Sequence, residues 1–257
     1  MDEPKERLTA SADYLKMQEG KFKVSGDGVF FTLQGEGLTQ GMPAVFLRLH
    51  VCNLQCGWCD SWYTWNKKTP EFWTEANNYT VQEVSTMLES AWKAGTERKD
   101  LPIRVVVTGG EPTLQQKRIE ELARLHEDWN WEIETNGTIM PSQYLLEHFQ
   151  FNCSPKLENS DNKKALRIHP DVLHAINTAQ KSAFKFVIMT DNDLDEIQHD
   201  FIDTGYVSID KVILMPEGIT TDQLRGHMTQ VAEYAKKKGF RMLSRLQTDI
   251  WGTARRV

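Results

Sequence analysis

Apolar and polar positions along the chain alternate between two patterns. Short runs rich in branched and aromatic residues, which favour β-strands, occur at residues 44–49, 103–108, 131–135, 149–154, 183–189 and 211–215. Between them apolar positions recur at helical spacing, at residues 81–95, 115–128, 142–148, 171–180, 194–203 and 221–238. Thr80 and Glu83 have the spacing of a capping box, and Pro170 can open another helix. The pattern predicts repeated strand–helix units.

Such alternation implies right-handed βαβ units around a parallel sheet, open or curled toward a barrel. The chain has no internal repeat, low-complexity segment or long linker, so residues 1–257 are expected to form one α/β domain. Within this domain, about residues 1–22 would form an N-terminal extension. An aromatic-rich insertion of about residues 62–79 would follow the first predicted strand and its loop.

The composition restricts the classes of function. Because 36 acidic residues outnumber 30 basic ones, the formal net charge of −6 gives no general attraction to nucleic acid or anionic membranes. No apolar run approaches the length of a transmembrane helix, and the first residues lack the apolar centre of a signal peptide. We therefore expect a cytoplasmic protein with no nucleic-acid or membrane partner.

Three of the four cysteines lie within one short loop, as Cys52, Cys56 and Cys59 in the pattern C-x3-C-x2-C. Thiolates this close need a metal ion or an iron–sulfur cluster to offset their charge. Two interpretations are open: a structural zinc site with His50 as fourth ligand, or a cluster with one iron free to bind a cofactor or substrate. The odd grouping argues against a disulfide framework, and the distant Cys153 is expected to be a small buried residue.

Other segments with candidate chemistry also follow predicted strands, where ligands gather in α/β folds. They are Gly109-Gly110-Glu111-Pro112, Glu134-Thr135-Asn136-Gly137, Ser154-Pro155-Lys156 and Met215-Pro216-Glu217-Gly218. In the first, two glycines permit positive φ and let a ligand lie against bare backbone, while Glu111 adds an acceptor for an ammonium group. The sequence thus predicts one ligand site at the carboxyl edge of the sheet.

The cysteine spacing together with Thr108-Gly109-Gly110-Glu111-Pro112 resembles the radical S-adenosylmethionine (SAM) superfamily. Over most of the chain the sequence is similar to the 7-carboxy-7-deazaguanine synthase family, in residues 31–37, 41–48, 52–61, 154–156, 184–187 and 246–252. The resemblance implies a partial (β/α) barrel with a shortened β6/α3-like core and a parallel sheet. It also implies three cofactors: a 4Fe-4S cluster held by Cys52, Cys56 and Cys59, SAM, and Mg²⁺.

The activity that the resemblance implies is that of a radical SAM carbon–nitrogen lyase in queuosine and deazapurine biosynthesis. Its substrate would be 6-carboxy-5,6,7,8-tetrahydropterin, and its product 7-carboxy-7-deazaguanine, formed with loss of ammonia. A reductant such as flavodoxin and a homodimeric assembly are further expectations from the family.

Residue roles follow from position in the shared motifs. Arg48 would hold the substrate carboxylate, because a guanidinium fork fits a carboxylate, and Ser61 would ligate Mg²⁺. With Glu36 these two form the expected catalytic set. Substrate contacts are expected from Leu33, Gln34, Gly35, Glu36, Arg48, Thr108 and Val257. Cofactor contacts are expected from Trp58, Cys59, Asp60, Gly109, Gly110, Glu111, Thr135, Ser154, Pro155, Lys156, Met215, Pro216, Glu217 and Gly218.

Two alternatives to this interpretation stay open. An activating enzyme of the same superfamily, which places a glycyl radical on a protein partner, would share the cluster but would not need Gln34, Glu36 and Arg48. A zinc-stabilised binding protein would use the cysteines with His50. The chain also departs from the family pattern at Val51, where glycine is common, and at Gln247, where histidine is common.

Overall fold

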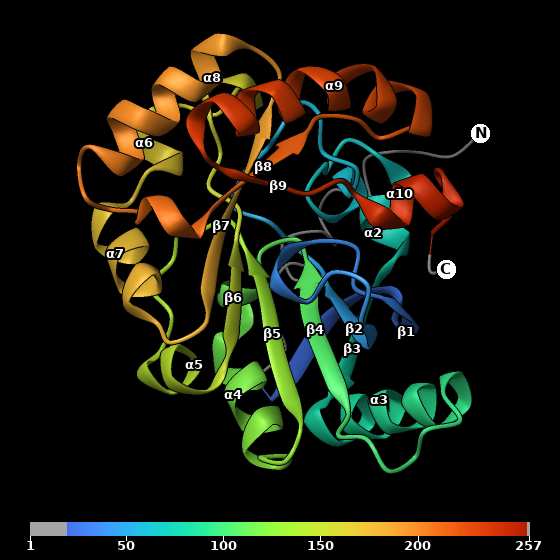
Figure 1. Cartoon of the computed structure of the whole chain (residues 1–257). Helices are drawn as coiled ribbons and strands as arrows, with labels where there is room; N and C mark the ends of the chain where they lie inside the picture. Colours follow the sequence, from blue (N-terminus) through green and yellow to red (C-terminus); the bar gives the residue numbers. More distant parts are fainter. Residues whose placement is uncertain (1–19, 256–257) are drawn as a thin grey trace.

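The computed structural model describes residues 20–255, which form one nine-stranded sheet flanked by helices (Figure 1). The strands are β1 (Lys21–Leu33), β2 (Pro43–Leu49), β3 (Ala76–Thr80), β4 (Arg104–Gly109), β5 (Asn130–Thr135), β6 (Gln150–Cys153), β7 (Ser182–Ile188), β8 (Val212–Pro216) and β9 (Arg241–Met242). The α-helices are α2 (Pro70–Thr74), α3 (Val81–Gly95), α4 (Gln116–Arg124), α5 (Gln143–His148), α6 (Lys164–Arg167), α7 (Pro170–Thr178), α8 (Asp191–Glu196), α9 (Thr221–Lys238) and α10 (Leu246–Trp251). Among residues 20–255, no helix has the length and apolar character needed to cross a membrane.

The six predicted strands are all present and lie side by side in chain order, as β2, β4, β5, β6, β7 and β8. Every neighbouring pair from β2 to β9 is parallel. The edge strands β3 and β9 do not pair with each other, so the sheet stays open. The predicted α/β class with a partial barrel is confirmed.

Three strands were not predicted, and each lacks a clear apolar alternation. β1 contains Gly26 and Gly28 and has an irregular register between Val24 and Val29, while β3 reads Ala-Asn-Asn-Tyr-Thr. β1 pairs antiparallel with β2 and with β3, so the last residues of the predicted insertion at residues 62–79 join the sheet edge in β3. The predicted extension at residues 1–22 overlaps the start of β1, and residues 1–19 lie outside the described part of the chain.

Helix boundaries follow local capping. The Thr80 hydroxyl accepts from the Glu83 backbone N–H at 3.2 Å, and Glu83 Oε2 accepts from the Thr80 N–H at 2.7 Å, which confirms the capping box of α3. α7 begins at Pro170 as predicted. The segment predicted at 115–128 ends earlier, at Arg124. The segment predicted at 194–203 is α8 continued by a π-helical turn, η5 (Ile197–Ile202).

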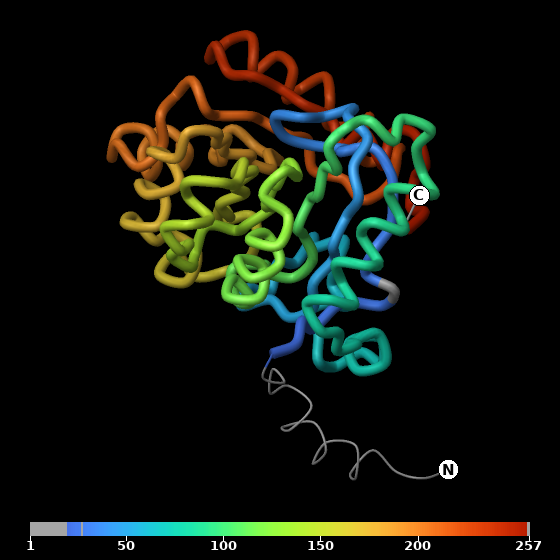
Figure 2. Tube along the Cα trace, turned by 90° about the horizontal axis from the view of Figure 1, so that it is seen from below, coloured from blue at the N-terminus to red at the C-terminus, as the bar shows by residue number. Residues whose placement is uncertain are grey.

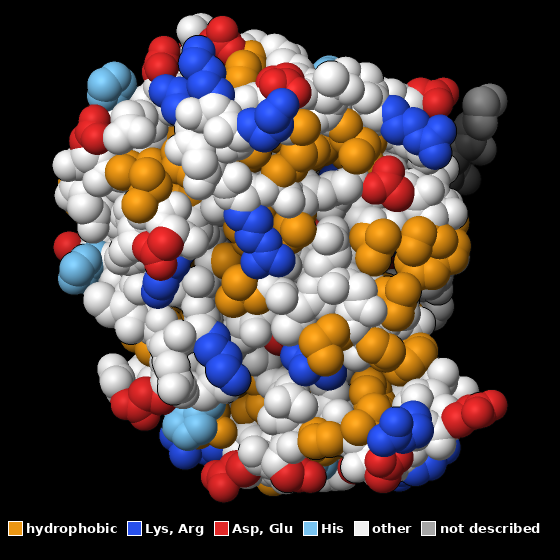
Figure 3. All heavy atoms as spheres, in the orientation of Figure 1, with side chains coloured by type: hydrophobic (Ala, Val, Ile, Leu, Met, Phe, Trp, Pro, Cys, Tyr) orange, Lys and Arg blue, Asp and Glu red, His pale blue; other side chains and the backbone are white. Residues whose placement is uncertain are grey.

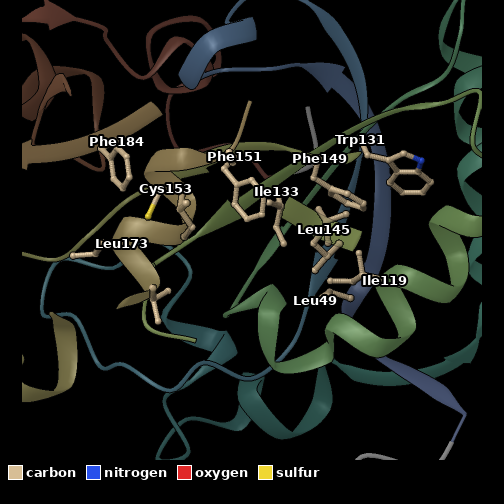
Figure 4. Close-up of a cluster of buried hydrophobic side chains, with 14 of the residues drawn as sticks. Leu49, Ile119, Trp131, Ile133, Leu145, Phe149, Phe151, Cys153, Leu173 and Phe184 are labelled. Carbon is tan, nitrogen blue, oxygen red and sulfur yellow. The ribbon is translucent and has the colours of Figure 1, made fainter. Parts of the chain in front are cut away.

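One face of the sheet carries apolar side chains, and the other carries polar and charged ones. The outer face packs against the helices in a buried core that includes Ile133, Phe151, Cys153 and Phe184 (Figure 4). Burial in this core raises the pKa of the Cys153 thiol. Because strand side chains alternate between faces, Glu132 and Glu134 of β5 and Lys185 of β7 lie on the inner face. The parallel strands therefore enclose a polar interior.

The turn between β1 and β2 folds into this interior. Thr39 Oγ1 donates to Glu132 Oε2 at 2.6 Å, and the Leu38 N–H donates to Asn152 Oδ1 at 3.3 Å. The C-terminal segment packs on the same turn, because the Leu246 N–H donates to the Gly35 carbonyl at 3.0 Å. Figure 2 shows this dark-red segment beside the blue N-terminal hairpin, with the green and yellow helical segments around the strands. The turn thus forms the floor of the interior.

Candidate functional site

A cavity of about 520 Å³ lies above this floor, at the carboxyl ends of the parallel strands. Its walls come from the loops after β2, β4, β5, β6 and β8, as predicted, and also from the turn after β1, from β7 and from the C-terminal segment. All predicted site residues line it except Glu111 and Pro155, and Val257, which lies outside the described residues. The structure brings the separate motifs together into one site.

The three clustered cysteines all line the cavity and form no disulfide. Burial raises the pKa of Cys52 to about 12 and that of Cys59 to about 11, so these thiolates need a positively charged partner. Among residues 20–255, no three His, Cys, Asp or Glu side chains converge as they would around a single metal ion. A larger group that spans separated thiols, such as an iron–sulfur cluster, fits this donor set.

His50 is not part of this site. Its side chain is fully buried, its ring lies 4.7 Å from that of Phe72, and it is absent from the cavity lining. Burial lowers the pKa of His50 to about 4. The zinc interpretation with His50 as fourth ligand is therefore wrong.

The glycines after β4 are required by close backbone packing. A Cβ at Gly109 would overlap the Leu49 backbone, and a Cβ at Gly110 would overlap the Val51 carbonyl. The Gly110 N–H donates to the Leu49 carbonyl at 3.0 Å. Their bare backbone thus holds the start of the cysteine loop against the strand ends, while both residues still line the cavity.

Glu111 holds neighbouring loops instead of facing the cavity. Its side chain is 1% exposed, and its carboxylate accepts from the Thr113 and Asn136 backbone N–H groups at 3.0 and 2.7 Å and from the Thr135 hydroxyl at 2.7 Å. With its oxygens occupied in this way, Glu111 ties the loop after β4 to the loop after β5. The structure does not place it to accept a bond from a ligand's ammonium group.

A buried lysine joins two carboxylates on the cavity wall. Lys185 Nζ donates to Glu36 Oε2 at 2.8 Å and also to Glu134. Burial would lower the pKa of Lys185, but Glu134 and Glu36 outweigh it and raise that pKa. Burial would likewise raise the pKa of Glu36, but Lys185 and Arg245 lower it well below its usual value. Burial together with Glu36 keeps the pKa of Glu134 raised, against the opposing effect of Lys185.

The charge network continues to the cysteine loop. Arg245 Nε donates to Glu36 Oε1 at 3.2 Å, and its Nη2 donates to Asp60 Oδ2. Ser61 Oγ donates to Asp60 Oδ1 at 2.9 Å and accepts from Arg48 Nη1 at 3.1 Å. Burial would raise the pKa of Asp60, but Arg245 and Arg48 lower it. Charges of opposite sign thus alternate along one wall, from Glu134 to Arg48.

The predicted substrate contacts in the floor turn already have protein partners. Gln34 Nε2 donates to Glu134 Oε1 at 3.0 Å, and Gln34 Oε1 accepts from the Glu36 N–H at 3.2 Å. Gln247 Nε2 donates to Glu36 Oε1 at 2.9 Å, and a Cβ at Gly35 would overlap the Gln247 amide. The floor is thus held in place before any ligand arrives.

Several cavity residues escaped the sequence analysis. Lys185 had a usable signal, because it is the one charged residue in the apolar run 183–189. Arg245 had no such signal in the sequence, because it lies outside every predicted strand and helix. The cavity also contains four buried polar atoms without a hydrogen-bond partner, Ser25 Oγ, Thr32 Oγ1, Trp65 Nε1 and Gln247 Oε1. Such atoms fit a cavity built to receive a polar ligand.

Comparisons with known proteins bear on this site. A family model described as "Radical SAM superfamily" matches residues 47–204. The chain is 32% identical to a 7-carboxy-7-deazaguanine synthase of Pyrobaculum aerophilum, covering 88% of this chain and 94% of the relative. It is 32% identical to a protein of the same name from Halobacterium salinarum, with 88% and 90% covered. The crystal structure of QueE from Escherichia coli has the same fold, with a TM-score of 0.64, 22% identity, and 88% and 94% of the two chains covered.

Proposed function

The chain belongs to the radical SAM superfamily and, within it, to the 7-carboxy-7-deazaguanine synthase family, and we propose that its cavity performs that family's reaction. The substrate is 6-carboxy-5,6,7,8-tetrahydropterin, and the product is 7-carboxy-7-deazaguanine, formed with loss of ammonia. The proposal rests on one observation above all. Three thiols and the Arg48–Ser61 pair, which serve different parts of the reaction, line the same cavity.

The cofactors fit the residues present. Cys52, Cys56 and Cys59 would hold a 4Fe-4S cluster, since all three thiols line one cavity and the raised pKa values of Cys52 and Cys59 call for a cationic partner. A reduced cluster with bound SAM supplies a 5′-deoxyadenosyl radical that can take a hydrogen atom from the substrate. The backbone of Gly109 and Gly110 would border the SAM methionine group, and Trp58 would border its adenine.

Arg48 would bind the substrate carboxylate. Its guanidinium carbon lies 5.6 Å from the Phe30 ring centroid, so an aromatic face supports the fork from one side. Its Nη1 is held by Ser61 Oγ. A guanidinium fixed at two places presents its remaining N–H groups in a defined direction, which favours paired hydrogen bonds to a carboxylate.

Ser61 would provide a protein ligand for Mg²⁺. Its hydroxyl donates to Asp60 and accepts from Arg48, so a cation bound to its oxygen would be attracted by Asp60 and would take the place of the Arg48 hydrogen bond. Mg²⁺ commonly keeps several waters and takes few protein ligands, with the substrate completing its coordination.

Glu36 and Glu134 would accept hydrogen bonds from the amino and N–H groups of the pterin. Both are half-buried and face the same cavity, and Lys185 links them. Gln34 accepts a hydrogen bond from the Glu36 backbone N–H. It would therefore set how far the edge of the pterin lies from the floor turn. A substrate that lacked these donors would form fewer hydrogen bonds with the cavity and should bind more weakly.

Anaerobic reconstitution tests the proposal. Protein loaded with iron and sulfide, then supplied with a chemical reductant, SAM, Mg²⁺ and carboxytetrahydropterin, should form a product with the mass of 7-carboxy-7-deazaguanine. Omission of the pterin is the control. Robust SAM cleavage without any deazapurine would reject the substrate and favour the activating-enzyme alternative.

The expected homodimer, Mg²⁺ requirement, flavodoxin-type reductant and cytoplasmic location stay predictions. For an interface between copies, the surface offers exposed apolar side chains, among them Met42 at 43% and Ile250 at 50%. Figure 3 shows hydrophobic side chains gathered on the side where Figure 1 places α10. Light scattering on purified protein would measure the mass of the assembly.

A further inference from the structure

The loop after β6 places an amide donor on one of the cluster cysteines. Asn162 Nδ2 lies 3.3 Å from Cys56 Sγ and donates to it. The same Nδ2 donates to the Ser160 carbonyl at 3.1 Å, while Asn162 Oδ1 accepts from the Gln55 backbone N–H at 3.1 Å. A flipped amide would point its NH₂ at the Gln55 N–H, so the hydrogen-bond network fixes nitrogen toward the sulfur.

This contact belongs to a tight fit between two loops. Asp161 adopts a left-handed backbone conformation, with φ of 64°, which turns the chain back toward the cysteine loop just before Asn162. The Gly57 N–H donates to the Ser160 carbonyl at 3.3 Å, and a Cβ at Gly57 would overlap the Asp161 carboxylate. The loop after β6 therefore packs closely against the cysteine loop near Cys56.

A buried arginine anchors both ends of the donor loop. Arg167 is 3% exposed; its Nη1 donates to the Lys156 carbonyl at 3.0 Å and its Nε to the Asn162 carbonyl at 3.1 Å. Arg167 is held in turn by an ion pair with Glu196. Because the loop is tied at residues 156 and 162, the Asn162 amide is in position before any cluster is bound.

We propose that Asn162 tunes the reduction potential of the cluster through its hydrogen bond to Cys56 Sγ. This inference rests on the proposed function, in which Cys56 is a cluster ligand. A donor on a ligand sulfur stabilises the extra negative charge of the reduced cluster more than it stabilises the oxidised cluster, so it raises the potential. Asn162 is thus a positioning residue that makes it easier for the electron donor to reduce the cluster.

The test is an anaerobic redox titration of reconstituted full-length protein, followed by electron paramagnetic resonance. Asn162→Leu removes the donor at similar size, and Asn162→Asp keeps the oxygen that accepts from Gln55 but replaces the donor with an acceptor. We expect reduction to become up to about tenfold less favourable in Asn162→Leu, which is about 59 mV for one electron. Asn162→Asp should shift at least as far in the same direction, because it adds negative charge.

Ser160→Ala is the matched control. It removes a hydroxyl that braces the same loop, at 3.2 Å from Asn162 Nδ2, but leaves the amide free to bond the sulfur, so its potential should match the wild type. Iron and sulfide content is measured for every protein. Unchanged potentials in both Asn162 variants, or an equal shift in Ser160→Ala, would overturn the inference. If Asn162→Leu assembles no cluster, Asn162→Asp decides alone. A wild-type protein that binds no cluster would instead reject the proposed function itself.

Discussion

The ammonium of Lys185 in β7 lies 2.8 Å from the carboxylate of Glu36 in the floor turn, across 149 positions of the chain. The Lys185 side chain is 3% exposed, so this pair is shielded from water. In a buried ion pair of this kind, each charge contributes to stability mainly by neutralising the other. Removal of either member leaves an unpaired charge in a poorly solvated place.

Lys185→Met should therefore destabilise the protein by about 3 kcal/mol, since Glu134 would lose the ammonium that it pairs with and Glu36 would keep only Arg245. Equilibrium urea unfolding measures the change. Lys164→Met is the control, because the Lys164 side chain is 62% exposed and its pair with Asp200 should contribute less than about 1 kcal/mol. Equal losses in the two variants would contradict the role of Lys185.

The pH dependence of stability should reveal Glu36. The pKa of its carboxyl lies below the usual value of 4.5, because Lys185 and Arg245 outweigh the effect of burial. The stabilisation is therefore fully present above pH 4.5 and is lost as the pH falls below it. Between about pH 6 and pH 3, unfolding free energy should fall less in Glu36→Gln than in the wild type. Glu89→Gln, from the exposed i,i+4 pair with Lys93, should keep the wild-type slope.

Val51 is strained, with φ of 75° in a region that a β-branched side chain adopts poorly. The glycine that the family resemblance leads us to expect at this position would adopt the same φ without strain. Val51→Gly should raise the unfolding free energy by about 1 kcal/mol, since relief of strain exceeds the added chain entropy of glycine. Val81→Gly, at the start of α3, should lower it by a similar amount. A loss of stability in Val51→Gly would show that the strain is compensated elsewhere.

Arg48→Ala should raise KM for the pterin by about tenfold to a hundredfold, because a charged hydrogen-bonding partner of the substrate carboxylate is lost. Arg48→Lys should recover part of this loss, since it keeps the charge but not the fork. Cluster content and uncoupled SAM cleavage serve as internal controls and should persist in both. A fall in kcat alone, at unchanged KM, would argue against carboxylate binding.

The tail after α10 is fastened to the aromatic segment. Arg255 lies 3.8 Å above the Tyr63 ring and donates to both carboxylate oxygens of Glu75, at 3.1 and 2.6 Å. Arg255→Ala should speed hydrogen exchange in α10 by about tenfold, as a stacked and bidentate contact is lost. Arg98→Ala, whose partner Asp100 is 65% exposed, should leave that exchange unchanged. Unaltered exchange in Arg255→Ala would mean that α10 is held by its other contacts, which include those with Thr221, Gly35 and Glu36.

The sequence predicted the parallel strands because their apolar runs are strong, and it predicted the cavity edge because each motif follows a strand. It could not predict the floor. The turn at residues 34–42 owes its position to contacts with Glu132 and Asn152, which are more than ninety positions away. Arg245 likewise lies in a segment without pattern and reaches the site only through tertiary packing. The sequence led us to expect that Glu111 would accept a hydrogen bond from a ligand. Whether its side chain points into the cavity cannot be predicted from the spacing of residues along the chain.

The pairing of Glu36 with residues near the end of the chain has a consequence for biosynthesis. Arg245 and Gln247 follow Glu36 by 209 and 211 positions. A ribosome therefore releases Glu36 and the cysteine loop well before it releases either of these partners. A nascent chain therefore exposes its thiols well before the cavity around them is complete. Enclosure of the site thus follows exposure of the thiols, and a chain truncated before Arg245 would present open thiols without a finished pocket.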